Sequence, residues 1–216
     1  MSKLTGRFIT LEGGEGTGKS TQARRLASHL RACGHTVLET REPGGSPGAE
    51  AIRHVLLSGA AEALGTEAEA LFFAAARADH MDERIRPALE AGCFVVCDRF
   101  IDSSRVYQGA LGAVEPELLN ALEYVATGGT FPDLTIVLDV PAEMGLARAA
   151  ARGRADRFEK EGLCYHSAVR DAFLDLARHS SRHIVVDARG DVNEVADRVA
   201  ALTDARLFGK HVERAQ

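Results

Sequence analysis

Residues 13–20 have the types and the spacing needed to bind a chain of phosphate groups. They read Gly-Gly-Glu-Gly-Thr-Gly-Lys-Ser, which matches the pattern G-x-x-x-x-G-K-[ST]. The glycines allow successive backbone N–H groups to converge on anionic oxygens. Lys19 supplies a compact positive charge, and the Ser20 hydroxyl can ligate Mg²⁺. The residues that this phosphate loop predicts to hold a nucleotide are Gly13, Gly14, Glu15, Gly16, Thr17, Gly18, Lys19, Ser20 and Thr21.

The surroundings of the loop favour a phosphate site over the alternative, a glycine-rich turn with a chance lysine. Phe8–Glu12, ahead of the loop, is apolar and β-branched, as a strand should be. Behind the loop, Thr21–Arg31 carries Ala23, Leu26 and Leu30 at helical spacing. Strand, glycine loop and helix therefore follow one another in the order that the motif requires. The pattern alone does not name a reaction.

Two further groups of charged residues could act on phosphates. Asp98 and Arg99 follow an apolar stretch together, which suits ligand chemistry, although a surface ion pair would give the same pattern. Four arginines lie between residues 148 and 157, with Gly153 among them as a candidate hinge. They could form a solvated helix face with screened charges. Because a phosphate loop is present, we favour a mobile flap that closes over phosphates.

Five stretches with the composition of strands must position these residues, and helical patterns separate them. The predicted strands are Phe8–Glu12, Thr36–Thr40, Phe94–Asp98, Leu134–Asp139 and His183–Asp187. Most are continuous apolar runs, which is typical of parallel strands covered by helices on both faces. Strands separated by helices predict right-handed crossovers and a doubly wound α/β sheet. Ligands of such sheets collect at the carboxyl ends of the strands, where Asp98 and Arg99 lie.

Helical patterns occupy most of the remaining chain. They cover residues 21–31, 49–57, 66–90, 115–126, 142–151 and about 165–176, with a last helix that opens on a capping box of Asp191 and Glu194. Thr66 and Glu69 suggest a capped start for the longest helix, and Pro87 predicts a kink or break near Arg86.

Two aromatic residues of the longest helix could be either core or ligand residues. Phe73 and Arg77 lie four residues apart on one helix face. Spacing alone favours a core position for Phe72 and Phe73, because aromatic side chains at helical spacing usually pack inside.

Composition excludes several classes of protein. The chain has 216 residues, enough for one sizeable domain, and its net charge of −5 disfavours a protein that coats nucleic acid. No apolar run approaches the ~20 residues of a membrane span, and the first strand begins too early to leave room for a signal peptide. Cys33, Cys93, Cys97 and Cys164 contain no Cys-x-x-Cys pair, so we expect reduced, structural cysteines in a cytoplasmic protein.

Several separated motifs together resemble the thymidylate kinases (dTMP kinases) of bacteria. The resemblance runs from about Phe8 to Leu202, and their common order is more specific than the phosphate loop alone. The motifs are Gly13–Thr21, Thr40-Arg41-Glu42-Pro43-Gly44-Gly45, Phe73-x-x-x-Arg77, Asp98-Arg99, Ser103 with Tyr107-Gln108, Phe131-Pro132-Asp133-Leu134-Thr135 and Asp156-Arg157-Phe158-Glu159. The resemblance implies a single kinase domain over residues 1–216, a phosphate-loop NTPase fold and a homodimer.

The resemblance also implies a site for dTMP. Phe73 is similar to the aromatic residue that stacks on thymine, which reverses the core interpretation, and Arg77 to the arginine that bonds the carbonyl edge of the base. Arg99 resembles the clamp on the acceptor phosphate, and Tyr107 the residue that crowds the sugar 2′ position. The family's acceptor site maps onto Glu15, Pro43, Phe73, Arg77, Arg99, Ser103, Ser104, Tyr107 and Gln108.

The donor side and the metal follow from the same resemblance. The turn with Ala188 and Arg189 is similar to the one that packs on the adenine of ATP. Mg²⁺ is implied near Ser20, Glu15 and Asp98. The phosphate loop lacks the arginine that some members carry, and members of this second type place catalytic arginines in a lid. The implied catalytic residues are Lys19, Asp98, Arg99 and, in a lid at about residues 150–160, Arg152, Arg154 and Arg157.

The expected reaction is the transfer of the γ-phosphoryl group of ATP to dTMP. One alternative is a kinase of the same fold that acts on dUMP, dCMP or dGMP. The other is a nucleotide-binding regulatory protein, which would bind ATP or GTP without an acceptor-dependent turnover. Asp98, Arg99 and the arginine-rich lid disfavour this second alternative. The polar tail at about residues 208–216 has no predicted role.

Overall fold

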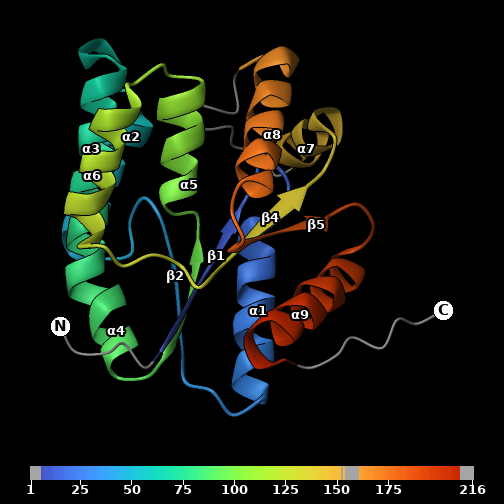
Figure 1. The fold of residues 1–216 in the computed structure, drawn as a ribbon. Helices are drawn as coiled ribbons and strands as arrows, with labels where there is room; N and C mark the ends of the chain where they lie inside the picture. Colours follow the sequence, from blue (N-terminus) through green and yellow to red (C-terminus); the bar gives the residue numbers. More distant parts are fainter. Residues whose placement is uncertain (1–5, 152, 154–160, 210–216) are drawn as a thin grey trace.

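A five-stranded parallel sheet lies at the centre of the computed structural model, which describes residues 6–151, 153 and 161–209 (Figure 1). Its strands are β1 (Arg7–Glu12), β2 (Val37–Arg41), β3 (Phe94–Asp98), β4 (Leu134–Asp139) and β5 (His183–Asp187). They lie in the order β2-β3-β1-β4-β5, with every pair parallel. This confirms the predicted doubly wound α/β fold. The bounds of β3, β4 and β5 are those predicted, and β1 and β2 differ by one residue.

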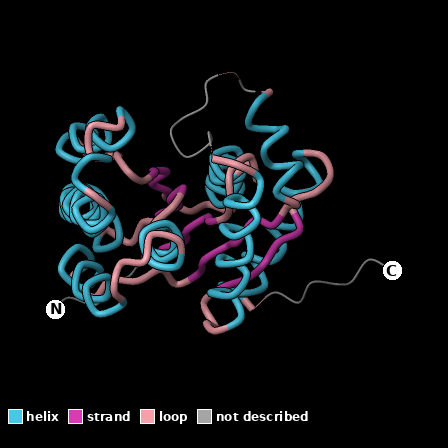
Figure 2. Tube along the Cα trace, turned by 90° about the horizontal axis from the view of Figure 1, so that it is seen from above, coloured by secondary structure: helices cyan, strands magenta, loops and turns pink. Residues whose placement is uncertain are grey.

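Helices cover both faces of this sheet, as Figure 2 shows from above. They are α1 (Lys19–Ala32), α2 (Pro47–Ser58), α3 (Thr66–His80), α4 (Arg86–Glu90), α5 (Ile101–Ser104), α6 (Pro116–Thr127), α7 (Ala142–Ala150), α8 (Leu163–Arg178) and α9 (Val192–Phe208). The short helical segments η1 (Glu62–Leu64), η2 (Met81–Ile85) and η3 (Arg105–Ala110) connect some of them, the last two with π-type geometry.

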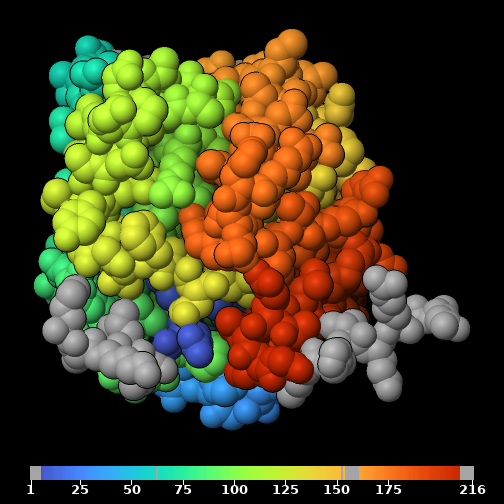
Figure 3. Space-filling view, in the orientation of Figure 1, coloured from blue at the N-terminus to red at the C-terminus, as the bar shows by residue number. Residues whose placement is uncertain are grey.

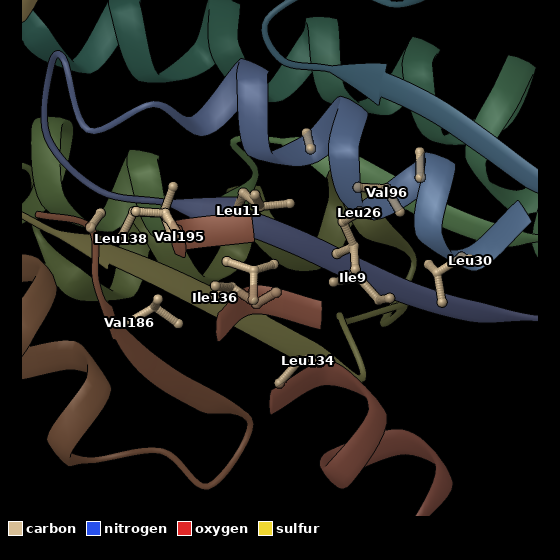
Figure 4. Close-up of a cluster of buried hydrophobic side chains, with 14 of the residues drawn as sticks. Ile9, Leu11, Leu26, Leu30, Val96, Leu134, Ile136, Leu138, Val186 and Val195 are labelled. Carbon is tan, nitrogen blue, oxygen red and sulfur yellow. The ribbon is translucent and has the colours of Figure 1, made fainter. Parts of the chain in front are cut away.

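The alternation of side chains along the strands divides the core into two layers. Ile9 and Leu11 of β1 pack with Leu26 and Leu30 of α1 and with Val195 of α9 on one face (Figure 4). On the other face, strand residues pack against η2, α4 and the start of α5, and against α8 and η3 further along the sheet. The second layer therefore fixes the segment that follows β3, where the candidate site residues lie.

That second face also carries segments that are distant in the sequence. In Figure 3, residues 101–127, coloured green to yellow, lie beside the orange α8 across the surface. Figure 1 shows α2, α3 and α6 gathered beyond one side of the sheet, α7 and α8 beyond the other, and α5 between the two groups. The carboxyl ends of the strands open between these groups.

Two predictions about helix ends are confirmed and one is wrong. The long helical pattern breaks before Arg86, where α4 begins, and the capping box of α9 is present. The Thr66 cap is wrong, because Gly65 occupies the N-cap position without a side-chain hydrogen bond. Glu69 instead accepts a hydrogen bond of 3.0 Å from Gln108 Nε2, and this contact is buried. Residues 101–110 form helical segments that the pattern did not predict.

Two other expectations from composition can be compared with the structure. All four cysteines are free thiols. Among the described residues, no helix combines the length and the apolar character that a membrane crossing requires.

Candidate active site

The phosphate loop folds between β1 and α1, as its sequence context predicts. Gly13, Gly16 and Gly18 have φ angles of +135°, +68° and +93°, in the range that favours glycine. Lys19 Nζ folds back to donate to Gly14 O at 2.7 Å and to Gly13 O at 3.1 Å. Burial lowers the pKa of Lys19 to about 8, and the nearby Arg99 contributes to the shift, so at pH 7 most molecules keep this charge.

A second close approach fixes the middle of the loop. A Cβ atom on Gly16 would lie 1.8 Å from the backbone oxygen of Gly145 in α7, and one on Gly145 would lie 2.4 Å from Glu15 O. The phosphate loop and α7 therefore touch backbone to backbone, which only glycine permits at these two positions.

A cavity of about 290 Å³ opens beside the loop, between the carboxyl ends of β1, β2 and β3 and the helices above them. Every residue predicted for the acceptor site lines it: Glu15, Pro43, Phe73, Arg77, Arg99, Ser103, Ser104, Tyr107 and Gln108. The loop residues Gly16, Gly18, Lys19, Ser20 and Thr21 line it as well. Phe73 is half-buried at this cavity, so the core position that its spacing favoured is wrong. The Glu42–Pro43 peptide bond at its wall is cis.

Arg99 is held by several contacts in this cavity. It follows β3 with a φ of +71°, a conformation that residues other than glycine rarely adopt. Its Nη2 donates to Glu15 Oε1, its Nη1 donates to Ser103 Oγ at 3.1 Å, and its guanidinium lies 5.3 Å from the centre of the Tyr107 ring. Burial opposes the charge, but Glu15 together with Tyr107, Asp98 and Glu12 more than offsets it, and the pKa of Arg99 lies above its ordinary range.

Asp98 and Ser20 form a polar pair at the mouth of the phosphate loop. Ser20 Oγ donates to Asp98 Oδ2, and Asp98 Oδ1 is buried with no hydrogen-bond partner among the described residues. Tyr107 OH donates to Glu15 Oε1 at 3.2 Å, so Glu15, the third residue predicted near the metal, is bonded to a residue predicted for the acceptor site. No cluster of three or more acidic, histidine or cysteine ligands occurs in the described part of the chain.

Glu12 is a site residue that the sequence reasoning missed. It is the last residue of β1 and is fully buried. Its Oε1 accepts from Phe100 N at 2.7 Å and Ser103 N at 3.3 Å, and its Oε2 accepts from Ser103 Oγ at 2.7 Å. Glu12 thus holds the turn that carries Arg99. Burial, together with the charge of Asp102, raises its pKa to about 7.

Arg41 and Arg53 also line the cavity and were not predicted. Arg41 ends β2 and pairs with Glu50 at 2.9 Å, whereas Arg53 Nη1 donates to Pro43 O at 2.6 Å from α2. Together with Lys19, Arg77 and Arg99 they give the cavity five cationic side chains, in a chain whose net charge is −5. Arg41 lies inside a motif quoted for the resemblance, so it could have been predicted to line the site. Arg53 could not, because a single arginine in a helical pattern does not indicate a binding role.

Ala188 and Arg189 lie apart from this cavity, at the carboxyl end of β5, two strands from the phosphate loop. Arg148 of α7 braces this turn by donating to Ala188 O at 2.9 Å and to Gly190 O at 3.3 Å. Arg189 pairs with Asp187 at 2.7 Å. The sheet order therefore separates the predicted acceptor residues from the predicted adenine turn, with the phosphate loop between them.

The predicted lid arginines lie outside the described residues. They are Arg152, Arg154 and Arg157.

Known proteins resemble this chain along nearly its whole length. The family model described as "Thymidylate kinase" matches residues 11–199. A thymidylate kinase of Nitrobacter winogradskyi is 57% identical over 207 residues, with 94% of this chain and 90% of the relative covered. A thymidylate kinase of Bradyrhizobium diazoefficiens is 55% identical over 207 residues, covering 94% of this chain and 91% of the relative.

A solved structure gives the same result for the fold. The crystal structure of a thymidylate kinase from Ehrlichia chaffeensis superimposes with a TM-score of 0.74 at 30% sequence identity. The match covers 92% of this chain and 98% of that one. The phosphate loop, the parallel sheet and the extent of these matches agree, and this chain belongs to the thymidylate kinase family.

Proposed function

We propose that this protein transfers the γ-phosphoryl group of ATP to the 5′-phosphate of dTMP, which gives ADP and dTDP. The observation that carries the proposal is that one cavity beside the phosphate loop gathers all the acceptor residues expected from four separate parts of the chain. The cavity is of the size and mixed polarity typical of small-molecule sites. Membership of the thymidylate kinase family supports the same reaction.

The attacking atom in this reaction is an oxygen of the acceptor phosphate. A phosphate monoester has a second pKa of about 6, so it is largely ionised at neutral pH and needs no dedicated general base. The obstacle is the repulsion between two anions. Lys19 and the loop N–H groups hold the donor phosphates, and Arg99 orients the acceptor in line with them. Positioning and positive charge therefore supply most of the catalysis.

The predicted lid supplies further positive charge to the transition state. Arg152, Arg154 and Arg157 stabilise the negative charge of the transition state, and lid closure excludes water that would hydrolyse ATP. The backbone contact between Gly16 and Gly145 joins the phosphate loop to α7, the helix that leads to the lid, and supports this assignment.

Mg²⁺ is the proposed cofactor, and the residues present fit it. The Ser20 hydroxyl and the unpartnered, buried Asp98 Oδ1 are oxygen donors of the kind that this ion prefers, and Glu15 lies across the same cavity. Few protein ligands are needed, because Mg²⁺ in such sites is bound mainly by phosphates and water. When bound, the ion neutralises charge on the donor phosphates.

A cytoplasmic homodimer is the proposed state of the protein. The free thiols support a reducing compartment. Leu71 on α3 and Tyr124 and Val125 on α6 are 53%, 68% and 77% exposed, and α3 and α6 pack against each other. Exposed apolar side chains on adjoining helices support an interface with a second copy.

An acceptor panel tests the proposed reaction. Purified protein is incubated with ATP, Mg²⁺ and each of dTMP, dUMP, dCMP and dGMP, and ADP and the nucleoside diphosphate are quantified. We expect the highest kcat/KM with dTMP. Turnover confined to another monophosphate, or nucleotide binding without acceptor-dependent ADP release, would overturn the proposal.

A further inference from the structure

A buried chain of polar side chains runs behind the wall of the acceptor cavity. Thr40 Oγ1 and His80 Nε2 are 2.7 Å apart, and His80 Nδ1 lies 3.1 Å from Glu42 Oε1. Glu42 Oε2 in turn accepts from Arg77 Nε at 2.7 Å. His80, Arg77 and Glu42 are 0%, 4% and 6% exposed. The proposed reaction assigns a direct contact only to Arg77, so Glu42 and His80 have no role in it.

The hydrogen bonds fix which atoms donate to Glu42. A carboxylate only accepts, so Glu42 receives an N–H from Arg77 on one oxygen and an N–H from His80 Nδ1 on the other. In the neutral ring, His80 Nε2 then accepts the hydroxyl proton of Thr40. A Cβ on Gly45 would lie 2.4 Å from His80 Nε2, so the loop after β2 closes directly over the ring. The arrangement has one orientation for each group.

Arg77 is bound on several sides. Its Nη1 and Nη2 each donate to Ser104 Oγ at 3.2 Å, and Nη2 also donates to Phe100 O at 3.2 Å. A guanidinium has five N–H donors, and these bonds together with that to Glu42 use four within the described part of the chain. One N–H of Nη1 is left, and Arg77 lines the cavity. A guanidinium held in this way offers a ligand one donor and no acceptor.

We propose that Glu42 and His80 are positioning residues that fix the guanidinium of Arg77 and thereby select a base with a carbonyl at the edge facing it. The inference rests on the proposed function. Thymine carries a carbonyl oxygen at position 4, whereas cytosine carries an amino group there. A fixed N–H donor pairs with the carbonyl and confronts the amino group with a second donor. A site built for one hydrogen bond rejects the wrong partner strongly, because a buried polar group then stays unpaired.

Glu42→Gln tests the inference, with Glu123→Gln as the matched control. A glutamine amide has no charge and one accepting oxygen, so it cannot accept from Arg77 and from His80 Nδ1 at the same time, and its hold on Arg77 is weaker. Glu123 is 3% exposed and pairs with Arg105 at 2.6 Å, but it does not line the cavity. The kcat and KM for dTMP, dCMP and ATP are measured for the wild type and both variants, and thermal melting confirms that each folds.

The expected result is a change in selectivity. In Glu42→Gln, kcat/KM for dTMP falls by about 10- to 100-fold, as expected for a bond to a charged group, and the dTMP-to-dCMP ratio of kcat/KM falls by about tenfold. The KM for ATP stays within about twofold of the wild type, and Glu123→Gln keeps the wild-type ratio. An equal fall for dTMP and dCMP would overturn the inference, since it indicates a structural support alone.

A second pair of variants tests the role of His80 and covers the case in which Glu42→Gln does not fold. His80→Leu removes the N–H donated to Glu42, whereas His80→Asn can place an amide N–H at the position of Nδ1. We expect the leucine variant to lose dTMP selectivity and the asparagine variant to recover most of it. Equal ratios in both would contradict the inference. Failure of this inference can be distinguished from failure of the proposed function. If the proposed function is wrong, the wild type itself does not prefer dTMP.

Discussion

The residue with the most demanding position in the site is Arg99. It combines a positive φ, an ion pair with Glu15 and a place on the cavity wall, and Glu12 holds its turn from below. A strained backbone that surrounding contacts over-determine is a common feature of functional sites. Under the proposed function, the positive φ directs the Arg99 guanidinium toward the position of the acceptor phosphate.

We predict that Arg99→Ala loses phosphoryl transfer and keeps MgATP binding. Without the clamp the acceptor phosphate is repelled and misplaced, so kcat/KM for dTMP falls by at least about 100-fold. Calorimetry with MgATP should give a dissociation constant within about threefold of the wild type, since the donor phosphates are held by the phosphate loop. Arg99→Lys keeps the charge without the planar fork and should lie between the two. Normal turnover of the alanine variant would remove Arg99 from its assigned role.

The raised pKa of Glu12 leads to a prediction about how the free energy of unfolding depends on pH. Its pKa is about 7 in the folded protein and 4.5 as the ordinary value. Between these values the folded protein binds more protons than the unfolded chain, so this group's contribution to the free energy of unfolding decreases as pH rises. The shift corresponds to about 3 kcal/mol over the full window.

The measurement compares wild type with Glu12→Gln, which is neutral at every pH. Urea unfolding at pH 5 and at pH 7.5 gives the free energy of unfolding of both proteins. The stability of the wild type relative to the variant should decrease from the lower to the higher pH. A difference that is constant or increases with pH would contradict the burial argument.

At the scale of elements, the phosphate loop depends on α7 as well as on its own glycines. We predict that Gly16→Ala abolishes MgATP binding. The new Cβ would lie 1.8 Å from Gly145 O, and the φ of +68° disfavours any L side chain, so the loop must leave its position. Gly162→Ala is the control, because no atom lies within 4 Å of its Cβ and its φ is −74°. Calorimetry with MgATP should detect binding in the control only; binding by both would show that the loop tolerates the shift.

Most elements could be predicted because their hydrophobic patterns are long. Strands such as Leu134–Asp139 are continuous apolar runs, and the capping box that begins at Asp191 predicts the start of α9. Residues 101–110 were missed because a four-residue helix followed by a π-type segment has no regular period. The predicted cap at Thr66 is wrong because Glu69 accepts a buried hydrogen bond from Gln108, a residue distant in the sequence. Local sequence does not show such a contact.

The candidate site was predicted where its residues stand in motifs and was missed where they act through others. Phe73, Arg77 and Tyr107 belong to recognisable motifs and line the cavity together. Glu12 does not stand out, because an acidic residue at a strand end normally faces water, and Glu42 stands in a recognised motif that gives no sign of its contact with Arg77. Only the three-dimensional arrangement shows that both are buried and bonded to the residues that line the cavity.

At the scale of the whole molecule, the sheet order separates the sites predicted for the two substrates. The cavity lies over β1, β2 and β3, and the turn expected to meet adenine lies beyond β4 at the end of β5. The phosphate loop follows the central strand β1, which is where the proposed function requires the phosphates of the two nucleotides to meet. Arg148 connects α7 to the β5 turn, which links the helix before the predicted lid to the predicted adenine turn. Such an arrangement suits an in-line transfer across the middle of the molecule.

The exposed face of α3 and α6 leads to a prediction about assembly. We predict that the wild type elutes as a dimer, with a mass of about twice 23.1 kDa by light scattering, and that Val125→Asp converts it to a monomer. Val125 is 77% exposed beside Tyr124, and a charge buried there on association would be unpaired. Val185→Asp is the control, because Val185 is 45% exposed on the edge strand β5, at the other end of the sheet from β2, and should leave the dimer intact. A wild type that is monomeric at micromolar concentration would contradict the dimer. A monomer produced by Val185→Asp alone would place the interface on another surface. The cavity is built from one chain, so the monomeric Val125→Asp protein should keep its MgATP affinity and show whether dimerisation affects turnover at all.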